Sequence, residues 1–174
     1  MSEKNKSILK DILSYVLIIL AVVAIRVFIF DPIRVDGPSM DKTLSNGEVV
    51  ILNKYEYRKK DIKRYDIVVV KIDGKKIIKR VIGLPNEKIE IKDNKVYANG
   101  EELDSSFASS KAKDFTMSDI GLVKIPGDSY FVMGDNRAVS LDSRYPEVGT
   151  IKKDQILGKA ALIIWPVNKI KIIK

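Results

Sequence analysis

The chain has 174 residues, of which 31 are basic and 23 acidic, and it contains neither histidine nor cysteine. These absences exclude Ser-His-Asp triads, Cys-His pairs, disulfides, and zinc sites built on histidine or thiolate ligands. A base for nucleophilic chemistry must therefore be lysine, aspartate, glutamate or tyrosine. The net charge of +8 is dispersed along the chain, which favours an anionic membrane surface at least as much as nucleic acid.

The first distinctive stretch is an apolar run from Ile12 to Phe30, interrupted by one charge at Arg26. As a helix its 19 residues would extend about 28 Å, close to the ~30 Å hydrocarbon core of a bilayer. We expect a transmembrane helix over residues 12–30, with residues 1–11 cytoplasmic because they carry lysines. Arg26 is near the outer end, where its side chain can reach the headgroups. The alternatives are a buried core helix and a cleaved signal peptide, although no small-x-small site follows the run.

Residues 31–174 read as short strands and turns, which predicts a mainly β, antiparallel, barrel-like domain outside the membrane. The dipeptide Asp73-Gly74 should close a hairpin. Segment 103–120, within a small excursion at about 92–126, is expected to be a loop with at most one helical turn. The expected strands cover residues 33–35, 48–53, 65–72, 75–84, 88–91, 95–98 and 130–133, with one or two more in the tail.

Lys79 is the candidate base on the strand at residues 77–82. The two-residue period of a strand places Ile77 and Val81 on the same face as Lys79 and places Arg80 on the other. Arginine cannot act as a base, because its guanidinium stays protonated. A free lysine has a pKa of about 10.4, which burial among apolar neighbours can lower by roughly 3 to 5 units. The alternative is an ordinary lysine that extends from a strand edge into water.

Ser39 follows Gly37-Pro38 and is either a turn serine or a nucleophile. The polar segment from Gly134 to Arg144 follows an apolar strand and combines arginines, aspartates and serines. Such a mixture suits a hydrogen-bonded scaffold beside a site, or alternatively a surface loop. Its oxygen ligands lack the spacing of an EF-hand. We expect neither a metal nor a cofactor for this protein.

Taken together, these segments resemble the type I signal peptidases, the membrane-anchored Ser/Lys proteases that remove signal peptides from exported proteins. The chain departs from the family pattern at Lys42, where proline is usual, and at Asn86-Glu87, where glycine-aspartate is usual. The short region at 92–126 resembles the compact Gram-positive form. The matching segments are Gly37 to Met40 with Thr43-Leu44, Tyr65 to Val69, Lys79 to Pro85, and Gly134 to Arg144.

The resemblance implies that Ser39 is the nucleophile and Lys79 its general base. Ser140 would hold the lysine amine through a hydrogen bond, and Asp142 and Arg144 would form a supporting ion pair. The implied function is an endopeptidase that removes N-terminal signal peptides after small-x-small sites. Its partners would be secretory preproteins and the lipid bilayer, with no nucleic acid and no metal.

The resemblance also implies how the oxyanion and the substrate are bound. The oxyanion hole would use the Ser39 N–H and a backbone donor near Gly37, since relatives with serine at the latter position use its hydroxyl. The substrate would add as an extended strand beside the segment preceding Ser39 and the strand carrying Lys79. The residues expected to contact it are Ile33, Val35, Asp36, Ile77 and Ile78.

Two other functions fit parts of the sequence. One is a catalytically silent, membrane-anchored β-domain that assists the assembly of surface proteins, although it would not need both Ser39 and Lys79. The other is a self-cleaving Ser/Lys repressor, which requires a DNA-binding domain, and residues 1–31 have no room for one. The favoured interpretation is therefore a single-pass enzyme of the cell membrane.

Overall fold

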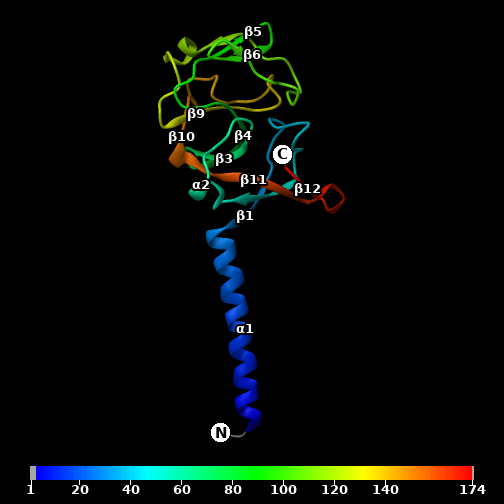
Figure 1. The fold of residues 1–174 in the computed structure, drawn as a ribbon. Helices are drawn as coiled ribbons and strands as arrows, with labels where there is room; N and C mark the ends of the chain where they lie inside the picture. The colour runs from blue at the N-terminus through cyan, green and yellow to red at the C-terminus, as the bar shows by residue number, and fades with distance from the viewer. Residues whose placement is uncertain (1–2, 174) are drawn as a thin grey trace.

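The computed structural model describes the backbone of residues 3–173, and the side chains of all of these except residues 3–6, 9 and 25–28. One long helix, α1 (Glu3–Phe28), extends from a β-rich domain (Figure 1). The predicted helix 12–30 is wrong at its outer end, because Phe30 already pairs with Asn53 in an antiparallel ladder. Pro32 follows closely, and a proline there would disrupt a continuing helix.

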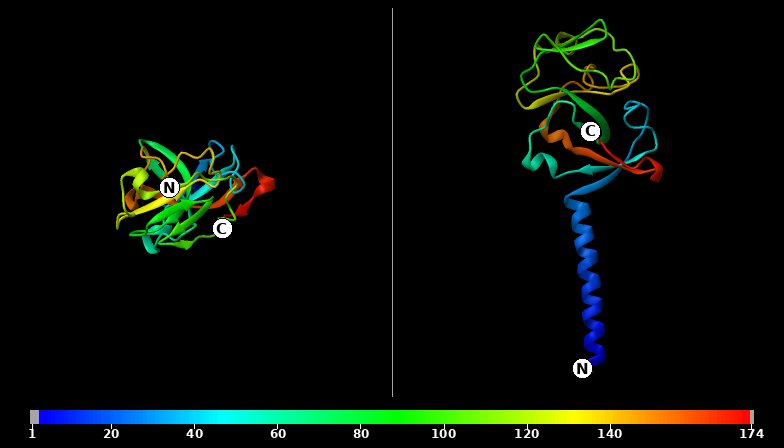
Figure 2. Two further views of the ribbon diagram at one scale, coloured as in Figure 1. Left: turned by 90° about the horizontal axis from the view of Figure 1, so that it is seen from above. Right: turned by 45° about the vertical axis from the view of Figure 1, so that its right-hand side comes forward.

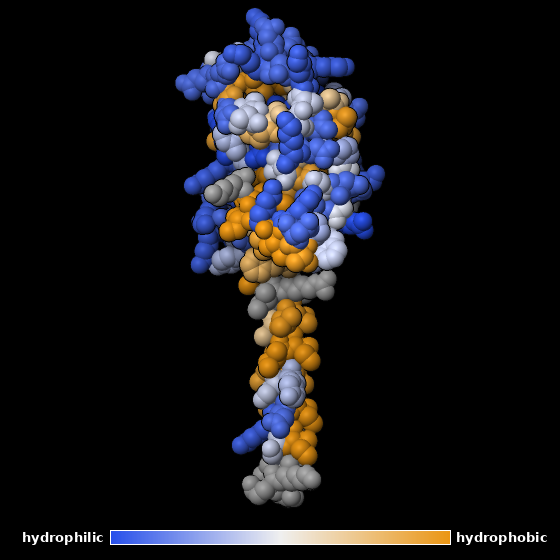
Figure 3. Space-filling view, turned by 90° about the vertical axis from the view of Figure 1, so that its right-hand side faces the viewer, coloured by the Kyte–Doolittle hydropathy of each residue, from blue (hydrophilic) through white to orange (hydrophobic). Residues whose placement is uncertain are grey.

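The described side chains of α1 are largely apolar and exposed, as the orange surface of the helix shows (Figure 3). Among the residues whose side chains are described, no helix has the length and apolar character needed to cross a membrane. The side chain of Arg26, for which we expected a place near the headgroups, lies outside the described residues.

The main sheet has eight strands in the order β1-β2-β11-β3-β4-β9-β10, with β12 paired to β11. Neighbouring strands of this sheet pair antiparallel, which confirms the prediction of a mainly β, antiparallel domain. Its strands are β1 (Phe30–Arg34), β2 (Val49–Asn53), β3 (Ile67–Ile72), β4 (Lys75–Gly83), β9 (Ser129–Met133), β10 (Ile151–Lys152), β11 (Ile156–Trp165) and β12 (Lys171–Ile172).

A second sheet lies at the end of the domain away from α1 (Figures 1 and 2). It contains β7 (Glu101–Glu102), β6 (Lys95–Ala98), β5 (Ile89–Lys92) and β8 (Phe115–Thr116), in that order. Segment 103–120 therefore holds a short strand as well as the expected helical turn, η1 (Met117–Ile120). The remaining elements are α2 (Glu56–Lys59), η2 (Lys153–Gln155) and η3 (Val167–Lys169).

The hairpin of β3 and β4 is the predicted one. Its turn residues Asp73 and Gly74 have φ values of 48° and 78°. Two consecutive positive φ values are typical of the tight turns whose twist matches that of the flanking strands. Ile72 consequently pairs with Lys75, and the register brings Lys79 opposite Val68.

Apolar side chains on both faces of this hairpin fix β4 in the core. Ile78 packs with Val69 and with residues of β1, β2 and β11, whereas Val81 packs with Val68 on the other side. Beyond them, Ile82 joins a third cluster that is shared with the second sheet. The strand that carries Lys79 is therefore held by contacts on each of its faces.

Gly158 allows β11 to pass close to β2. A substitution at this position therefore tests the packing of the sheet. A Cβ at this position, where φ is +154°, would lie 2.3 Å from the backbone oxygen of Asn53. Gly158→Ala is expected to lower the free energy of unfolding by at least ~2 kcal/mol, measured by thermal unfolding of the full chain in detergent. Gly127→Ala is the control, since its Cβ would meet only the Asn86 side chain at 3.6 Å. Equal melting temperatures for both variants would contradict the expectation.

Candidate functional site

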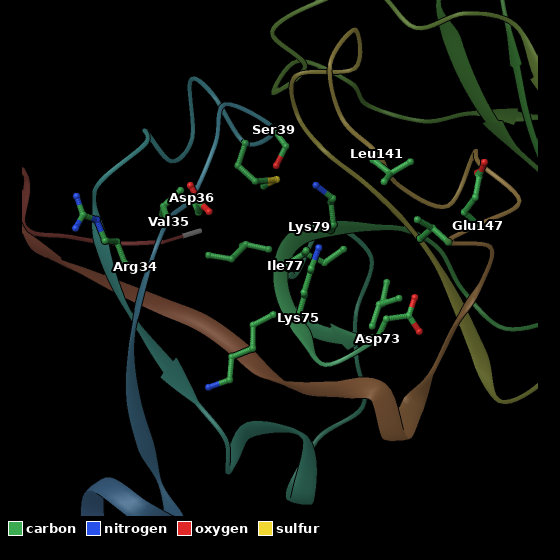
Figure 4. Close-up of a pocket in the computed structure, with 15 residues that line it drawn as sticks. Arg34, Val35, Asp36, Ser39, Asp73, Lys75, Ile77, Lys79, Leu141 and Glu147 are labelled. Atoms are coloured by element: carbon green, nitrogen blue, oxygen red, sulfur yellow. The ribbon is translucent and has the colours of Figure 1, made fainter.

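Ser39 and Lys79 line the same cleft, which has a volume of about 650 Å³ (Figure 4). Ser39 belongs to the segment after β1, and Lys79 lies in the middle of β4. Figure 4 shows the lysine amine directed towards Ser39. The structure therefore brings together two residues that are forty positions apart in the chain.

The segment that carries Ser39 is a tight turn anchored by its neighbours. Gly37 has a φ of +83°, which favours glycine, and the following proline restricts the backbone further. Met40 and Leu44 are 1% and 0% exposed, and the Leu44 N–H donates to the Met40 carbonyl at 2.8 Å. Burial of these side chains fixes Ser39 at the rim of the cleft.

The cleft lies between two strand edges that lack a neighbouring strand. Within residues 3–173, strand β1 pairs with β2 alone, and β4 pairs with β9 only from Arg80 onwards. Between these edges, the carboxylate of Asp31 contacts the amine of Lys76 at 3.2 Å. The outer edge of β1 and the unpaired half of β4 thus face one another, with room between them for an extended peptide.

Lys79 is 4% exposed, and among the described residues no hydrogen bond or ion pair is assigned to its amine. Burial lowers the pKa of Lys79 below its ordinary value, while the nearby Asp142 carboxylate opposes this shift and Arg144 reinforces it. The apolar flanks predicted for this lysine are present, because Ile77 and Val81 pack in one cluster. This environment favours the neutral amine.

The hydrogen bond that we expected between Ser140 and Lys79 is not formed. The Ser140 hydroxyl is buried and has no hydrogen-bond partner among the described residues. Its oxygen packs instead against the backbone at Gly134, only 2.3 Å from where a Cβ would stand. Ser140 and the Ser39 carbonyl both lie close to Gly134, but the Ser140 hydroxyl does not make the predicted contact with the lysine amine.

Of the two backbone N–H groups predicted to bind the oxyanion, the one at Gly37 already has a hydrogen-bond acceptor and the one at Ser39 does not among the described residues. The Gly37 N–H donates to Asn46 Oδ1 at 3.0 Å, so this group is already engaged in a hydrogen bond. The Ser39 N–H has no assigned acceptor within the described part of the chain, while the Ser39 carbonyl accepts the Asn136 N–H at 3.0 Å. The sequence analysis did not predict this contact of Asn46, which lies nine residues after Gly37 in the chain.

The ion pair predicted between Asp142 and Arg144 is present and bidentate. Arg144 Nε and Nη2 lie 2.8 and 2.9 Å from the two carboxylate oxygens. Asp142 also accepts the Gly134 N–H at 3.0 Å, and Arg144 donates to the Arg137 carbonyl at 2.7 Å. The pair therefore shapes the segment from Gly134 to Arg144 around Ser140.

A second buried ion pair was not predicted. Arg80 Nε and Nη2 lie 2.8 and 2.7 Å from the two oxygens of Asp135, which is 0% exposed. Thr43 donates to the same carboxylate at 2.5 Å, and Arg80 stacks over the ring of Phe107. This network joins β4, the Ser39 segment and the loop after β9. The sequence feature that could have predicted this ion pair is the adjacent cations Lys79 and Arg80 on an otherwise apolar strand, because a buried arginine needs a carboxylate partner.

Four of the five predicted substrate contacts line the cleft, but Ile33 does not. Its side chain is 9% exposed and packs in the core with Leu52 and Val50, because alternation along β1 turns it inwards. The residues that line the cleft besides Ser39 and Lys79 are Arg34, Val35, Asp36, Met40, Ile72, Asp73, Lys75, Lys76, Ile77, Ile78, Leu141, Glu147 and Val148.

The two departures from the family pattern have different backbone consequences. Asn86 has a φ of 69°, and asparagine tolerates this region better than most residues, so it can stand where glycine is usual. Lys42 has a φ of 74°, which proline cannot adopt. The turn after Ser39 therefore requires a residue other than the usual proline.

A protein-family model described as "Signal peptidase, peptidase S26" matches residues 8–165, which is most of the chain. The chain belongs to this family. Signal peptidase I P of Bacillus subtilis subsp. natto is 38% identical, over 97% of this chain and 96% of that relative. Signal peptidase I S of Bacillus subtilis strain 168 is also 38% identical, over 97% and 95% of the two chains.

The fold has a counterpart among solved type I signal peptidases. A crystal structure of a signal peptidase I from Enterococcus faecalis V583 is 32% identical, with a TM-score of 0.52, and the match covers 57% of this chain and 97% of that one. The resemblance to type I signal peptidases is thus confirmed, and the chain is a serine peptidase by family.

Gly134 lets the segments that carry Ser39 and Ser140 approach closely. A Cβ at this position would lie 2.4 Å from the Ser39 carbonyl oxygen, which belongs to the backbone and cannot move alone. Gly134→Ala should reduce the rate of preprotein cleavage about 100-fold, because small displacements of a reacting group cost that much. The rate is measured under single-turnover conditions with Gly127→Ala as control. Normal cleavage by Gly134→Ala would contradict the assigned contact.

Lys79→Met should stabilise the fold while removing the candidate base. Burial lowers the pKa of Lys79, so at neutral pH the unfolded chain binds a proton more readily than the folded chain. This cost is present at neutral pH, shrinks as pH rises above the folded pKa, and is absent with methionine. We expect a higher melting temperature for Lys79→Met, with a gain that diminishes at alkaline pH. Lys75→Met, on an exposed residue of the same strand, is the control.

Proposed function

We propose that this chain removes N-terminal signal peptides from exported preproteins by cleaving after small-x-small sites, with Ser39 as nucleophile and Lys79 as general base. The observation that carries the proposal is a buried lysine without an assigned partner in the same cleft as a serine. Structural lysines are seldom fully buried without a counter-ion. A neutral lysine, in contrast, suits the task of accepting a serine proton.

The proposed reaction proceeds through an acyl-enzyme. Ser39 Oγ attacks the scissile carbonyl carbon while its proton passes to the neutral amine of Lys79. The tetrahedral intermediate carries its negative charge near the Ser39 N–H, the donor left without an assigned acceptor. Lys79 then gives its proton to the departing amine of the mature protein. Water, activated by the same amine, releases the signal peptide and restores Ser39.

The shape of the cleft supports a preference for small side chains. An extended peptide can add between the free edges of β1 and β4, where backbone groups supply hydrogen bonds. Side chains of the peptide would alternate towards a floor that includes Val35, Met40 and Ile78, which are themselves largely buried. Alanine-sized residues would fit such shallow positions, which accounts for a small-x-small site.

We further propose that α1 anchors the chain in the membrane, with its N-terminus cytoplasmic and the β-domain outside. The support is the row of exposed large apolar side chains between Ile8 and Val23. The sequence continues this apolar character to Phe30. An anchor would confine enzyme and preprotein to one bilayer and so raise their effective concentration.

Cleavage of a preprotein by the detergent-solubilised full chain tests the assignment. Wild type should cleave, whereas Ser39→Ala and Lys79→Ala should lose roughly 10⁴-fold or more in kcat/KM, as when other nucleophile–base pairs are broken. Lys79→Arg should be equally inactive, since arginine keeps its proton. Mass spectrometry of the product identifies the cleaved bond.

Each outcome bears on a different part of the proposal. Unchanged cleavage by Ser39→Ala would remove the nucleophile, and turnover by Lys79→Arg would remove the base. Absence of cleavage by wild type, with preprotein binding retained, would favour the catalytically silent assembly factor. The wild-type rate should fall as pH is lowered through the folded pKa of Lys79, because only the neutral amine accepts a proton.

A further inference from the structure

A second cleft of about 650 Å³, here called the basal cleft, lies where the β-domain joins α1. The Lys54 N–H at its rim donates to the carbonyl of Ile29, the residue that follows α1, at 2.8 Å. Figure 1 shows α2 and β1 immediately beside the end of α1. The residues that line the basal cleft are Asp31, Leu52, Lys54, Tyr57, Arg58, Lys71, Gly74, Lys76, Lys153, Ile156 and Leu157.

The basal cleft concentrates positive charge. Five cations line it, against the single carboxylate of Asp31. Lys54 and Lys76 both lie near this carboxylate, at 3.8 and 3.2 Å. The other three cations, from α2, β3 and η2, have no ion pair assigned within the described part of the chain; they are Arg58, Lys71 and Lys153. Like charges around one cavity repel, so an anion placed between them would be attracted.

The apolar residues that line the rest of the basal cleft indicate which class of anion would bind there. Leu52, Ile156 and Leu157 supply an apolar wall beside the cations. A free inorganic ion would gain nothing from this wall, whereas a phospholipid presents a phosphate joined to an apolar body. The position of the cleft at the end of α1 favours the same class of ligand, since basic groups beside a membrane segment attract anionic headgroups.

We propose that the basal cleft binds the phosphate-bearing headgroup of an anionic phospholipid. The inference rests on the membrane placement of α1 proposed above. Cations from three separate elements of the β-domain would then hold a lipid at the junction. Because Lys76 also lines the cleft of Ser39, lipid bound here would set the orientation of that cleft towards the bilayer.

Native mass spectrometry of the full chain tests this site. The chain is released from neutral detergent micelles that contain equal amounts of phosphatidylglycerol and phosphatidylcholine. Wild type should retain phosphatidylglycerol at least tenfold in preference to phosphatidylcholine. The triple variant Arg58→Gln, Lys71→Gln and Lys153→Gln should lose this preference. A control with Lys88→Gln, Lys92→Gln and Lys124→Gln removes the same charge from exposed residues in the region of the second sheet and should keep it.

Three results of the lipid experiment would overturn the proposal. These are equal retention of both lipids by wild type, unchanged selectivity in the first triple variant, and equal loss in both triple variants, which would indicate net charge alone. Binding of inorganic phosphate without lipid selectivity would assign the cleft to the free ion and equally exclude the lipid. Thermal unfolding of both triple variants checks that they fold.

The test is separable from the proposed function. Ser39→Ala should retain phosphatidylglycerol as wild type does, so failure of the peptidase assignment leaves this result unaffected. Failure of the anchor would appear as absence of the chain from sedimented membranes. A chain that sediments with membranes yet shows no lipid selectivity would refute the basal cleft alone.

Discussion

The buried ion pair between Arg80 and Asp135 is the constraint on which the geometry of the site depends. Burial of two charges is favourable only when their remaining hydrogen-bonding groups are satisfied. Here Thr43 and the Tyr65 carbonyl complete the set, and the guanidinium lies over an aromatic ring. These contacts come from separate segments, so each segment is fixed relative to β4. Because adjacent strand residues face opposite sides, a fixed Arg80 also fixes the direction of Lys79.

The neighbouring cations of β4 thus have opposite environments. Arg80 has a carboxylate and several acceptors, whereas Lys79 has burial without an assigned partner. The first arrangement keeps a permanent charge in place, and the second destabilises a charge that can be lost. Arginine at position 79 could not become neutral, and lysine at position 80 could not form the bidentate contact with Asp135. The order Lys79-Arg80 therefore follows from the different chemistry of the two side chains.

Local patterns predicted much of this structure. Asp73-Gly74 specified the hairpin, and alternation along β4 gave the correct partners for Lys79. Contacts that depend on a third segment were not predictable in this way. The contact between the Asn46 side-chain oxygen and the Gly37 N–H depends on how two loops meet, which a period of two residues does not encode. Alternation places Ile33 and Arg34 on opposite faces of β1, but which of these faces lines the cleft depends on the curvature of the sheet.

The unpaired edges of β1 and β4 can bind an extended peptide, but they could also pair with strands of another chain. Their residues limit such pairing. Unpaired strand edges are templates for pairing with other chains. On β1, Pro32 removes a backbone donor, and on β4 the exposed Lys75 and Lys76 place charge at the edge. The ion pair of Lys76 with Asp31 links the edges at the end nearest α1, whereas Ser39 and Lys79 lie further along the cleft. An entering peptide must therefore compete with water and charge at one end but finds apolar contacts nearer Ser39, which favours short extended segments over a permanent strand partner.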